Sequence, residues 1–383
     1  MPTKPRLLFV VTEDWYFVSH RLDLARAARD AGFQVGIATR VGSCADQILA
    51  EGLELFPLRY MRRSSRNPWI ELRAINELTT LYRNWRPDIV HHVAAKPVIY
   101  GGIAARHASV PAVVSAFAGL GHVFASDDLR ARLLRRVLLV AYRGVFKHPL
   151  LRLIVQNPED QALVVKHRLV SPADLNLIRG SGVDTRVFGK SDEPTGPVTF
   201  VLAGRMLWNK GVGEFVEAAQ IVKELDVRAR FLLVGDTDAE NPGAIPRSQL
   251  SQWHKEGIVE WCGQRKDMPN VLKWAHVVCL PTYYGEGLPK VLLEAASCGR
   301  PLIATNVPGC REIAIHNETA LLVPAKDPIA LARAMQTLLD NKTLRERLGD
   351  RARALVGSNF TVEHINTQTV DIYRKLLERC KQL

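Results

Sequence analysis

Short apolar runs alternate with longer amphipathic stretches along the whole chain, and this alternation limits the possible folds more than any other feature. The runs have little polar alternation, which is typical of strands buried on both faces of a parallel sheet. They lie at 6–11, 34–39, 53–58, 88–93, 112–117 and 151–156, and again at 198–204, 230–235, 257–263, 276–281, 301–305 and 319–324. Helical patterns separate them, for example at 19–32, 68–85, 96–107, 211–225, 246–255, 288–298 and 327–339. Each half is therefore predicted to be a doubly wound α/β domain.

The length of 383 residues also favours two domains, because a single hydrophobic core stops growing at roughly 250 to 300 residues. The segment "FGKSDEPTGP" at 188–197 is rich in Pro, Gly and charge, and we interpret it as the linker. We expect a first domain over 1–188, a second over 198–360, and a C-terminal helix over 361–383 that packs back on the first. Two such domains would face each other across a cleft, with the carboxyl ends of their strands on both sides.

The six cysteines are scattered without a CxxC pair or a Cys/His cluster, which favours a reducing compartment and argues against structural zinc. No segment reaches the roughly 18 uninterrupted apolar residues of a membrane span. We interpret the protein as cytoplasmic.

Positive charge is concentrated in the first half of the chain. The first 190 residues carry 27 Lys and Arg against 16 Asp and Glu, whereas the rest carry 24 against 23. Much of the excess lies in 59–69 and in 129–155, where basic residues occur among apolar ones at helical spacing: Arg132, Arg135, Arg136, Arg143 and Lys147. Such a helix could lie on anionic lipid, or it could be an ordinary basic helix that packs inside the domain. No recognisable nucleic-acid motif accompanies the charge, so we expect no nucleic-acid partner.

The first loop of the second half, "VLAGRMLWNKGVGEF", places a turn with two cations between a strand and a helix. Gly204 and Arg205 follow the strand, and Lys210 immediately precedes the helix. Fixed cations beside helix N-terminal amides can hold a diphosphate, although a solvated basic loop would have the same sequence. The pattern is neither a Walker loop nor a dinucleotide fingerprint.

The stretch "YYGEGLPKVLLEAASCG" carries two carboxylates eight positions apart across a strand-loop-helix junction. Glu286 is expected in the loop at the mouth of the helix and Glu294 inside the helix. Free amides near Gly287 and Leu288 would favour a phosphate, and Glu294 could accept hydrogen bonds from two vicinal hydroxyls such as those of a ribose. This arrangement suits a nucleotide sugar better than a simple phosphate ester.

Four motifs in order resemble the retaining family 4 glycosyltransferases of GT-B fold, which have two Rossmann-like domains. They are "VLAGRMLWNKG" (201–211), "GEGLPKVLLEAASCGRPLIAT" (285–305), "VPGCREI" (307–313) and "TALLVPAKD" (319–327). The run "AGLGHVF" (118–124) resembles a subgroup that builds bacterial surface glycans, such as O-antigen and capsule, on polyprenyl-diphosphate carriers.

The resemblance implies roles for individual residues. Arg205 and Lys210 would hold the donor diphosphate, Glu286 the transferred sugar and Glu294 the ribose. The backbone around Gly287 and Leu288 would assist at the phosphate, and Arg265 with Lys266 would lie beside the base. The implied reaction moves a hexose or N-acetylhexosamine from a nucleotide sugar, with UDP preferred, to a lipid-linked glycan on the inner face of the membrane, and it needs no metal or other cofactor.

The first half departs from the family pattern at the position of an expected histidine. Ala118 stands there, and His122 lies three residues beyond Gly119 in the same loop. Ser19, His20 and Arg21 are expected to open the first helix, where they could meet phosphate or acceptor, and for His20, His91 and His92 a structural role remains open. Two alternative functions also remain open. The chain could be a glycosyltransferase with a soluble acceptor or a nucleotide-sugar epimerase.

Overall fold

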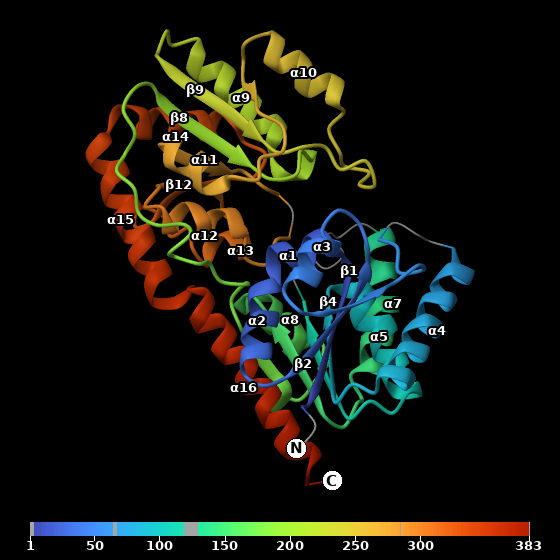
Figure 1. Cartoon of the computed structure of the whole chain (residues 1–383). Helices are drawn as coiled ribbons and strands as arrows, with labels where there is room; N and C mark the ends of the chain where they lie inside the picture. The colour runs from blue at the N-terminus through green and yellow to red at the C-terminus, as the bar shows by residue number, and fades with distance from the viewer. Residues whose placement is uncertain (1–3, 64–66, 118, 120–128, 284, 383) are drawn as a thin grey trace. The chain divides into compact units, whose positions relative to one another are not determined.

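A computed structural model of the chain describes residues 4–63, 67–117, 119, 129–283 and 285–382. The chain divides into two compact units (Figure 1). The first contains Met1–Ser181 and Val362–Leu383, and the second contains Gly182–Thr361. Each unit has its own sheet, and each is described by itself below.

The described residues of the first unit form a seven-stranded parallel sheet in the order β3-β2-β1-β4-β5-β6-β7. Its strands are β1 (Arg6–Glu13), β2 (Gln34–Arg40), β3 (Glu54–Pro57), β4 (Ile89–Val93), β5 (Ala112–Ala116), β6 (Leu151–Val155) and β7 (Leu175–Leu177). Its helices are α1 (Asp14–His20), α2 (Leu22–Asp30), α3 (Ala45–Ala50), α4 (Pro68–Trp85), α5 (Ala95–His107), α7 (Leu129–Val145), α8 (Pro158–Lys166), the short 3-10 helix η1 (Pro172–Asp174) and α16 (Val362–Cys380).

Two hydrophobic clusters hold this sheet between layers of helices. One cluster joins Phe9 and Val114 on the sheet to Leu24 of α2 and Tyr373 of α16. The other, on the opposite face, includes side chains of α4, α5 and α7. The C-terminal helix α16 is therefore part of the core of the first unit.

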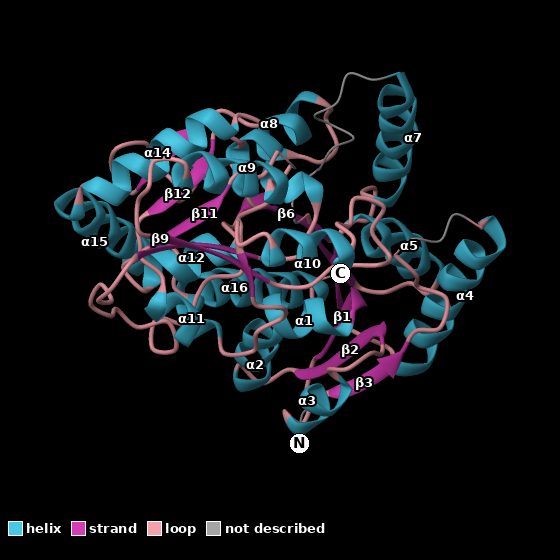
Figure 2. Cartoon of the chain, turned by 90° about the horizontal axis from the view of Figure 1, so that it is seen from above, coloured by secondary structure: helices cyan, strands magenta, loops and turns pink. Residues whose placement is uncertain are grey.

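The described part of the second unit contains a six-stranded parallel sheet in the order β10-β9-β8-β11-β12-β13. Its strands are β8 (Val198–Ala203), β9 (Ala229–Val234), β10 (Glu260–Trp261), β11 (Val277–Leu280), β12 (Leu302–Thr305) and β13 (Ala320–Val323). Its helices are η2 (Trp208–Lys210), α9 (Val212–Lys223), α10 (Arg247–Lys255), α11 (Met268–Trp274), α12 (Lys290–Ser297), α13 (Pro308–Arg311), α14 (Pro328–Asp340) and α15 (Lys342–Asn359). Figure 2 shows helices on both sides of the strands of this unit. Their side chains bury both faces of the sheet.

The segment 182–197 belongs to the second unit, although the sequence analysis placed 182–188 in the first domain and a linker at 188–197. Val183 forms a bridge to Thr361. Ser297 Oγ of α12 donates a hydrogen bond to the Phe188 carbonyl at 2.6 Å. Further along, the Arg345 guanidinium of α15 binds both carboxylate oxygens of Glu193 at 2.7 and 2.8 Å. These contacts attach the segment along the second unit.

Three expected elements differ from those in the structure. The helix expected over 19–32 is two helices separated at Arg21, whose φ of −130° lies outside the helical region. The amphipathic segment 129–155 is helical over Leu129–Val145, and its end forms β6, the strand that was expected at 151–156. The strand expected over 257–263 contains two residues, Glu260 and Trp261, because it pairs at the edge of the sheet and with β9 alone.

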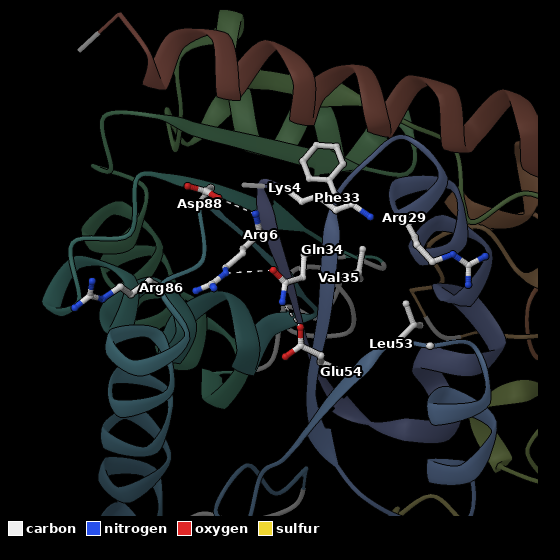
Figure 3. Close-up of a pocket in the computed structure, with 11 residues that line it drawn as sticks. Lys4, Arg6, Arg29, Phe33, Gln34, Val35, Leu53, Glu54, Arg86 and Asp88 are labelled. Carbon is white, nitrogen blue, oxygen red and sulfur yellow. Dashed lines mark hydrogen bonds between the residues drawn. The ribbon is translucent and has the colours of Figure 1, made fainter. Parts of the chain in front are cut away.

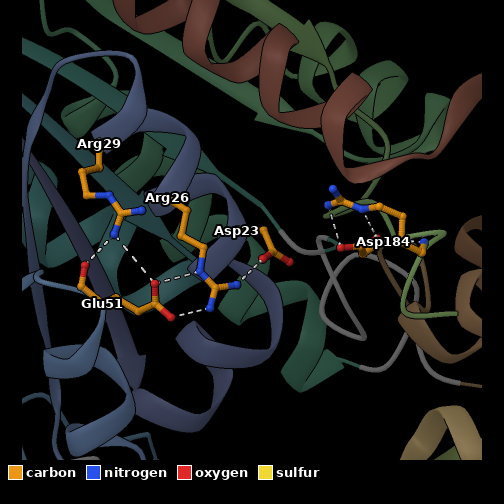
Figure 4. A network of polar contacts seen from close by, with 6 residues as sticks. Asp23, Arg26, Arg29, Glu51 and Asp184 are labelled. Atoms are coloured by element: carbon orange, nitrogen blue, oxygen red, sulfur yellow. Dashed lines mark hydrogen bonds and ion pairs between the residues drawn. The ribbon is translucent and has the colours of Figure 1, made fainter.

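A polar network joins α2 to α3 in the first unit (Figure 4). Arg26 contacts both Asp23 and Glu51, and Arg29 Nη1 donates to the Glu51 carbonyl at 2.5 Å. The two arginine side chains are more than a third exposed, so solvent screens the ion pairs and their contribution to stability is small.

Candidate functional site

The candidate site of the second unit lies where the strand order of its sheet reverses. β8 and β11 are neighbours, but the chain leaves them toward opposite edges of the sheet. Ligands of open α/β sheets bind beyond the carboxyl ends of strands at such a position. The loops that follow these two strands are 204–211 and 281–289, which are the segments that the sequence analysis selected.

Backbone contacts hold the two loops together. The carbonyl of Asn209 accepts hydrogen bonds from Thr282 Oγ1 at 3.0 Å and from the Tyr283 amide at 3.1 Å. Gly211 has a φ of +77°, and a Cβ at this position would lie 2.1 Å from the Pro281 carbonyl oxygen. Only glycine fits here, because it tolerates this φ and leaves room for the neighbouring backbone. Glycine at 211 therefore allows the end of the loop that carries Lys210 to lie directly against Pro281.

The loop contacts bring Lys210 and Glu286 into an ion pair, 76 residues apart in the chain. Glu286 Oε1 also lies 3.2 Å from Thr282 Oγ1, and it shares the single hydroxyl hydrogen of that residue with the Asn209 carbonyl. Both charged side chains are largely buried, with 17% and 12% of their surfaces exposed. A cation and a carboxylate are thus held next to each other where β8 and β11 end.

Arg205 is held by a second carboxylate from a different loop. Its Nη1 lies 2.9 Å from Oδ2 of Asp238, which follows β9. The neighbouring Asp236 pairs with Arg247 of α10. Both carboxylates of the "DTD" stretch (236–238) therefore have arginine partners.

Glu294 lies in the middle of α12, four residues after its first residue, Lys290, and its side chain is 12% exposed. Burial raises the pKa of its carboxyl, whereas the Lys290 ammonium at 3.7 Å acts in the opposite direction. The helix begins at Lys290, two residues later than expected, so Gly287 and Leu288 lie in the turn before it. A Cβ on Gly309 of α13 would lie 1.7 Å from the Gly287 carbonyl oxygen, so α13 packs directly against this turn.

Arg265 and Lys266 are the two residues expected near the base of the nucleotide. They follow β10, on the side of the sheet where the strands have their carboxyl ends. Arg265 binds both oxygens of Asp267, at 2.7 and 2.8 Å, and lowers the pKa of that carboxyl to about 2. Lys266 is exposed. Gly204 is also exposed, with a φ of +154°, and its amide donates to the Val234 carbonyl.

Sequence reasoning missed Asp238, Thr282 and Asn209 as members of this site. Asn209 Oδ1 is buried and has no hydrogen-bond partner among the residues that the structure describes. In the sequence, Asp238 belongs to the short acidic motif "DTD" (236–238). This motif does not reveal that the partner of Asp238 is Arg205, 33 residues earlier. Thr282 and Asn209 carry no signal, because their contacts depend on how the two loops meet.

The sheet of the first unit also reverses its strand order, between β1 and β4. α1 ends at His20 and α2 begins at Leu22, so Ser19, His20 and Arg21 end the first helix rather than open it. Ala94, which precedes α5, has a φ of +73°, an uncommon conformation for a residue other than glycine. Ala118 and His122 lie outside the described residues.

The two histidines of β4 are fully buried, on opposite faces of the sheet. His91 Nδ1 is 2.5 Å from the Tyr373 hydroxyl of α16, and His92 Nε2 is 3.0 Å from the Tyr82 hydroxyl of α4. Burial lowers the pKa of both imidazoles, to about 3 for His92. These contacts favour the structural role that the sequence left open.

A cavity of about 690 Å³ in the first unit lies at the amino ends of β1, β2 and β3, opposite the edge where ligands of such sheets bind (Figure 3). Much of its charge is already used internally. Arg6 donates to the Trp85 carbonyl and to Gln34, while Glu54 accepts from Gln34 and from Trp85 Nε1. The cavity therefore does not coincide with the expected acceptor site.

Among the described residues, no three His, Cys, Asp or Glu side chains are grouped so that they could hold a metal ion. Within the same residues, none of the helices combines the length and the apolar character that a membrane crossing requires.

The chain matches the models of two glycosyltransferase families. Residues 6–148 match the family described as Glycosyl transferase 4-like, and residues 197–341 match the family described as Glycosyl transferases group 1. The chain belongs to the glycosyltransferases of GT-B fold, and it is an enzyme. The two parallel sheets and the solved structures below confirm the α/β fold class expected from the sequence.

Two bacterial relatives match most of the chain. The N,N'-diacetylbacillosaminyl-diphospho-undecaprenol alpha-1,3-N-acetylgalactosaminyltransferase of Campylobacter jejuni is 26% identical over 346 residues, which cover 87% of this chain and 89% of the relative. The UDP-Gal:alpha-D-GlcNAc-diphosphoundecaprenol alpha-1,3-galactosyltransferase of Escherichia coli is 28% identical over 317 residues, 79% of each chain.

Solved structures with the same fold cover almost the whole chain. Sucrose-phosphate synthase from Thermosynechococcus elongatus has a TM-score of 0.80 at 20% identity and covers 98% of this chain and 100% of its own. Anabaena HepE in complex with UDP and glucose has a TM-score of 0.76 at 17% identity, with 96% and 99% covered.

Proposed function

We propose that this glycosyltransferase is a retaining enzyme that uses a nucleotide diphosphate sugar, with UDP as the preferred nucleotide. The observation that carries the proposal is the pairing of Lys210 with Glu286 at the strand-order reversal, with Arg205 in the same loop as Lys210. A cation beside a carboxylate suits a ligand that joins a diphosphate to a sugar, because the first binds the phosphate oxygens and the second the sugar hydroxyls.

The other residues of the site extend this assignment along the donor. Glu294 accepts hydrogen bonds from the ribose hydroxyls, and the amides of Gly287 and Leu288 contribute at the phosphate. Arg265 and Lys266 lie near the base, and Gly204 gives the first loop its turn. Two cations stand where a divalent ion would otherwise neutralise the diphosphate, so the proposal includes no metal.

In the proposed reaction, an acceptor hydroxyl attacks the anomeric carbon from the face that the nucleoside diphosphate leaves. The bond from the anomeric carbon to the diphosphate breaks as the new glycosidic bond forms, and the departing phosphate oxygen takes the hydroxyl proton. Lys210 and Arg205 stabilise the negative charge that develops on the diphosphate.

The proposed acceptor is a polyprenyl-diphosphate-linked glycan of bacterial surface polysaccharide synthesis, and the transferred group is a hexose or N-acetylhexosamine. The names of the Campylobacter jejuni and Escherichia coli relatives support this choice, because both include an undecaprenol diphosphate carrier.

A panel of UDP and GDP sugars, assayed for nucleotide release with and without a polyprenyl-diphosphate glycan, tests the donor and the acceptor together. We expect release with a UDP sugar that depends on the lipid-linked acceptor, a product of retained anomeric configuration, and no loss of activity in EDTA. Release with soluble oligosaccharides alone would contradict the lipid acceptor, and conversion of the donor without any acceptor would indicate an epimerase.

Helix α7 supports a peripheral position on the inner face of the cell membrane. Its exposed side includes Leu133, Val137 and Val140, which are 58 to 68% exposed, and the exposed Arg132 and Arg136 lie beside them. Tyr142 and Val145 are buried in the first unit. An exposed apolar stripe next to a basic one is the pattern of a helix that lies on anionic lipid.

Flotation with liposomes that contain anionic phospholipid tests this surface. We expect the wild type to float and Arg132→Glu/Arg136→Glu to remain in the soluble fraction. Lys375→Glu/Arg379→Glu, an equal change of charge at exposed positions of α16, serves as the control and should float. Equal flotation of all three proteins would contradict the role of α7.

A further inference from the structure

Asp238 has no part in the proposed donor contacts, yet it holds one of the two cations on which those contacts depend. Its carboxylate lies 2.9 Å from Arg205 Nη1, and its side chain is only 13% exposed. The loop that carries Asp238 runs alongside 206–208. The Met206 amide donates to the Asp236 carbonyl at 3.0 Å, and the Trp208 amide donates to the Gly243 carbonyl at 2.9 Å. Backbone hydrogen bonds on both sides of Asp238 thus keep it next to Arg205.

Both cations of the 204–211 loop have a carboxylate partner before any donor arrives. Lys210 pairs with Glu286, and Arg205 pairs with Asp238. A nucleoside diphosphate brings further negative charge, so its phosphates must compete with a carboxylate for at least one of these cations. Glu286 has a proposed use at the transferred sugar, whereas Asp238 has none. Asp238 is therefore the partner that donor binding displaces.

We propose that Asp238 is a positioning residue that holds Arg205 in place in the absence of donor and competes with the diphosphate for its guanidinium. This inference rests on the proposed use of a nucleotide diphosphate sugar. Donor binding then exchanges one anionic partner of Arg205 for another. When the diphosphate leaves, Asp238 takes the guanidinium back, which weakens the binding of the nucleotide product and favours its release.

The change Asp238→Asn tests the competition, because it removes the charge and keeps the size of the side chain. We expect the Kd for UDP to fall by roughly three- to fivefold, which corresponds to the upper end of the contribution of a partly exposed ion pair. The Kd should depend more steeply on salt. The affinity for uridine, which has no phosphate, should not change. In assays of sugar transfer, the KM of Asp238→Asn for the donor should be lower than that of the wild type. If release of the nucleotide product limits the rate, the kcat of this variant should also be lower.

The same loop offers a matched control in Asp236, whose carboxylate pairs with Arg247 instead of Arg205. Asp236→Asn should leave the Kd for UDP within about twofold of the wild-type value. A double-mutant cycle separates an effect through Arg205 from a general change of charge: in an Arg205→Gln background, Asp238→Asn should no longer tighten UDP binding. If Asp238→Asn does not fold, Asp238→Ser removes the same charge, and Asp238→Glu should retain the wild-type Kd.

Calorimetric titration of UDP into the wild type and these variants decides the matter. Tighter UDP binding in Asp238→Asn, unchanged uridine binding and loss of the effect without Arg205 would support the inference. Unchanged or weaker UDP binding in a folded Asp238→Asn protein would overturn it. Failure of the wild type to bind any nucleoside diphosphate would instead overturn the proposed function on which the inference rests.

Discussion

At the scale of single residues, the site depends on carboxylates that the fold keeps in unlike surroundings. Glu286 is paired with Lys210 and lies 3.2 Å from Thr282 Oγ1, whereas Glu294 lies in α12 with its nearest cation, Lys290, at 3.7 Å. Burial raises the pKa of Glu294 because it disfavours the charged form. A largely buried carboxylate whose Lys290 partner lies one turn earlier on the same helix is suited to accept hydrogen bonds from a ligand.

The change Glu294→Ala should therefore weaken the binding of UDP by about tenfold or more, because hydrogen bonds to a charged group contribute roughly 1.5 to 3 kcal/mol. The loss should disappear for the 2′,3′-dideoxy analogue of UDP, which lacks both hydroxyls, and calorimetry measures both affinities. The exposed Glu217 of α9 provides the control, since Glu217→Ala should bind both ligands as the wild type does. Equal weakening for UDP and its dideoxy analogue would contradict the ribose assignment.

Loss of Lys210 should reduce turnover more than it affects ribose binding. Lys210→Ala removes the buried cation proposed to stabilise charge on the departing diphosphate, and removal of such a group typically costs on the order of 10²-fold in kcat. Nucleotide release at saturating donor and acceptor measures this effect. A kcat within threefold of the wild-type value would rule out the proposed electrostatic role.

The sequence predicted part of this site, and the missing part has a physical explanation. Arg205, Lys210, Glu286 and Glu294 lie in strand-loop-helix junctions whose local patterns are readable. Asp238 was not predicted as a partner of Arg205, because their meeting depends on the path of a loop rather than on spacing along one element. Contacts between loops are set by backbone hydrogen bonds that leave no pattern in the side chains.

At the scale of secondary structure elements, prediction succeeded where the local signals agree. The expected helix over 68–85 is α4 with the same ends, because the Asn67 side chain caps the Trp69 amide, Pro68 fits the first turn and Arg86 ends the helix in a left-handed conformation. The expected helix over 19–32 was divided at Arg21, and β7 (Leu175–Leu177) was missed. β7 pairs with β6 and with no other described strand, and no apolar run marks it.

The junction between η2 and α9 makes a prediction at this scale. Gly211→Ala should destabilise the second unit by roughly 2 kcal/mol or more, because it adds a clash with the Pro281 carbonyl to the cost of a positive φ. Gly257→Ala is the matched control: its φ is +71°, but a Cβ there meets nothing within 4 Å, so only the conformational cost of about 1 to 2 kcal/mol remains. Thermal unfolding compares the two variants, and an equal loss of stability in both would show that the clash is relieved.

At the scale of the whole chain, the two sheets reverse their strand order in corresponding places, between β1 and β4 and between β8 and β11. The polypeptide returns to the first unit after completing the second, because α16 supplies Tyr373 and Leu376 to the first hydrophobic core. The first unit is therefore built from two separate parts of the sequence, whereas the second is the single stretch Gly182–Thr361. Folding of the first unit requires residues from both ends of the chain, and the hydrogen bond between His91 and Tyr373 joins them.

The buried histidines of that unit make its stability dependent on pH. Burial lowers the pKa of His92 to about 3 and that of His91 well below the ordinary value, whereas both are near 6.5 in an unfolded chain. Between those values the unfolded chain binds more protons, so stability is fully present above about pH 6.5 and is lost as the pH falls below it. His92 should contribute about 1.4 kcal/mol of loss per pH unit in this range, and the loss from His91 has the same direction.

Urea unfolding at pH 7.5, 6.5 and 5.5 measures the effect. We expect a midpoint that is nearly constant between pH 7.5 and 6.5 and that falls clearly by pH 5.5. His92→Gln, which cannot titrate and keeps a polar group toward Tyr82, should lower stability at pH 7.5 but show a smaller further loss at pH 5.5. His364→Gln, at an exposed position of α16, should retain the wild-type pH dependence. If His92→Gln lost as much stability between pH 7.5 and 5.5 as the wild type does, His92 would not need to be neutral for the first unit to fold. The pH dependence would then come from the other buried histidines.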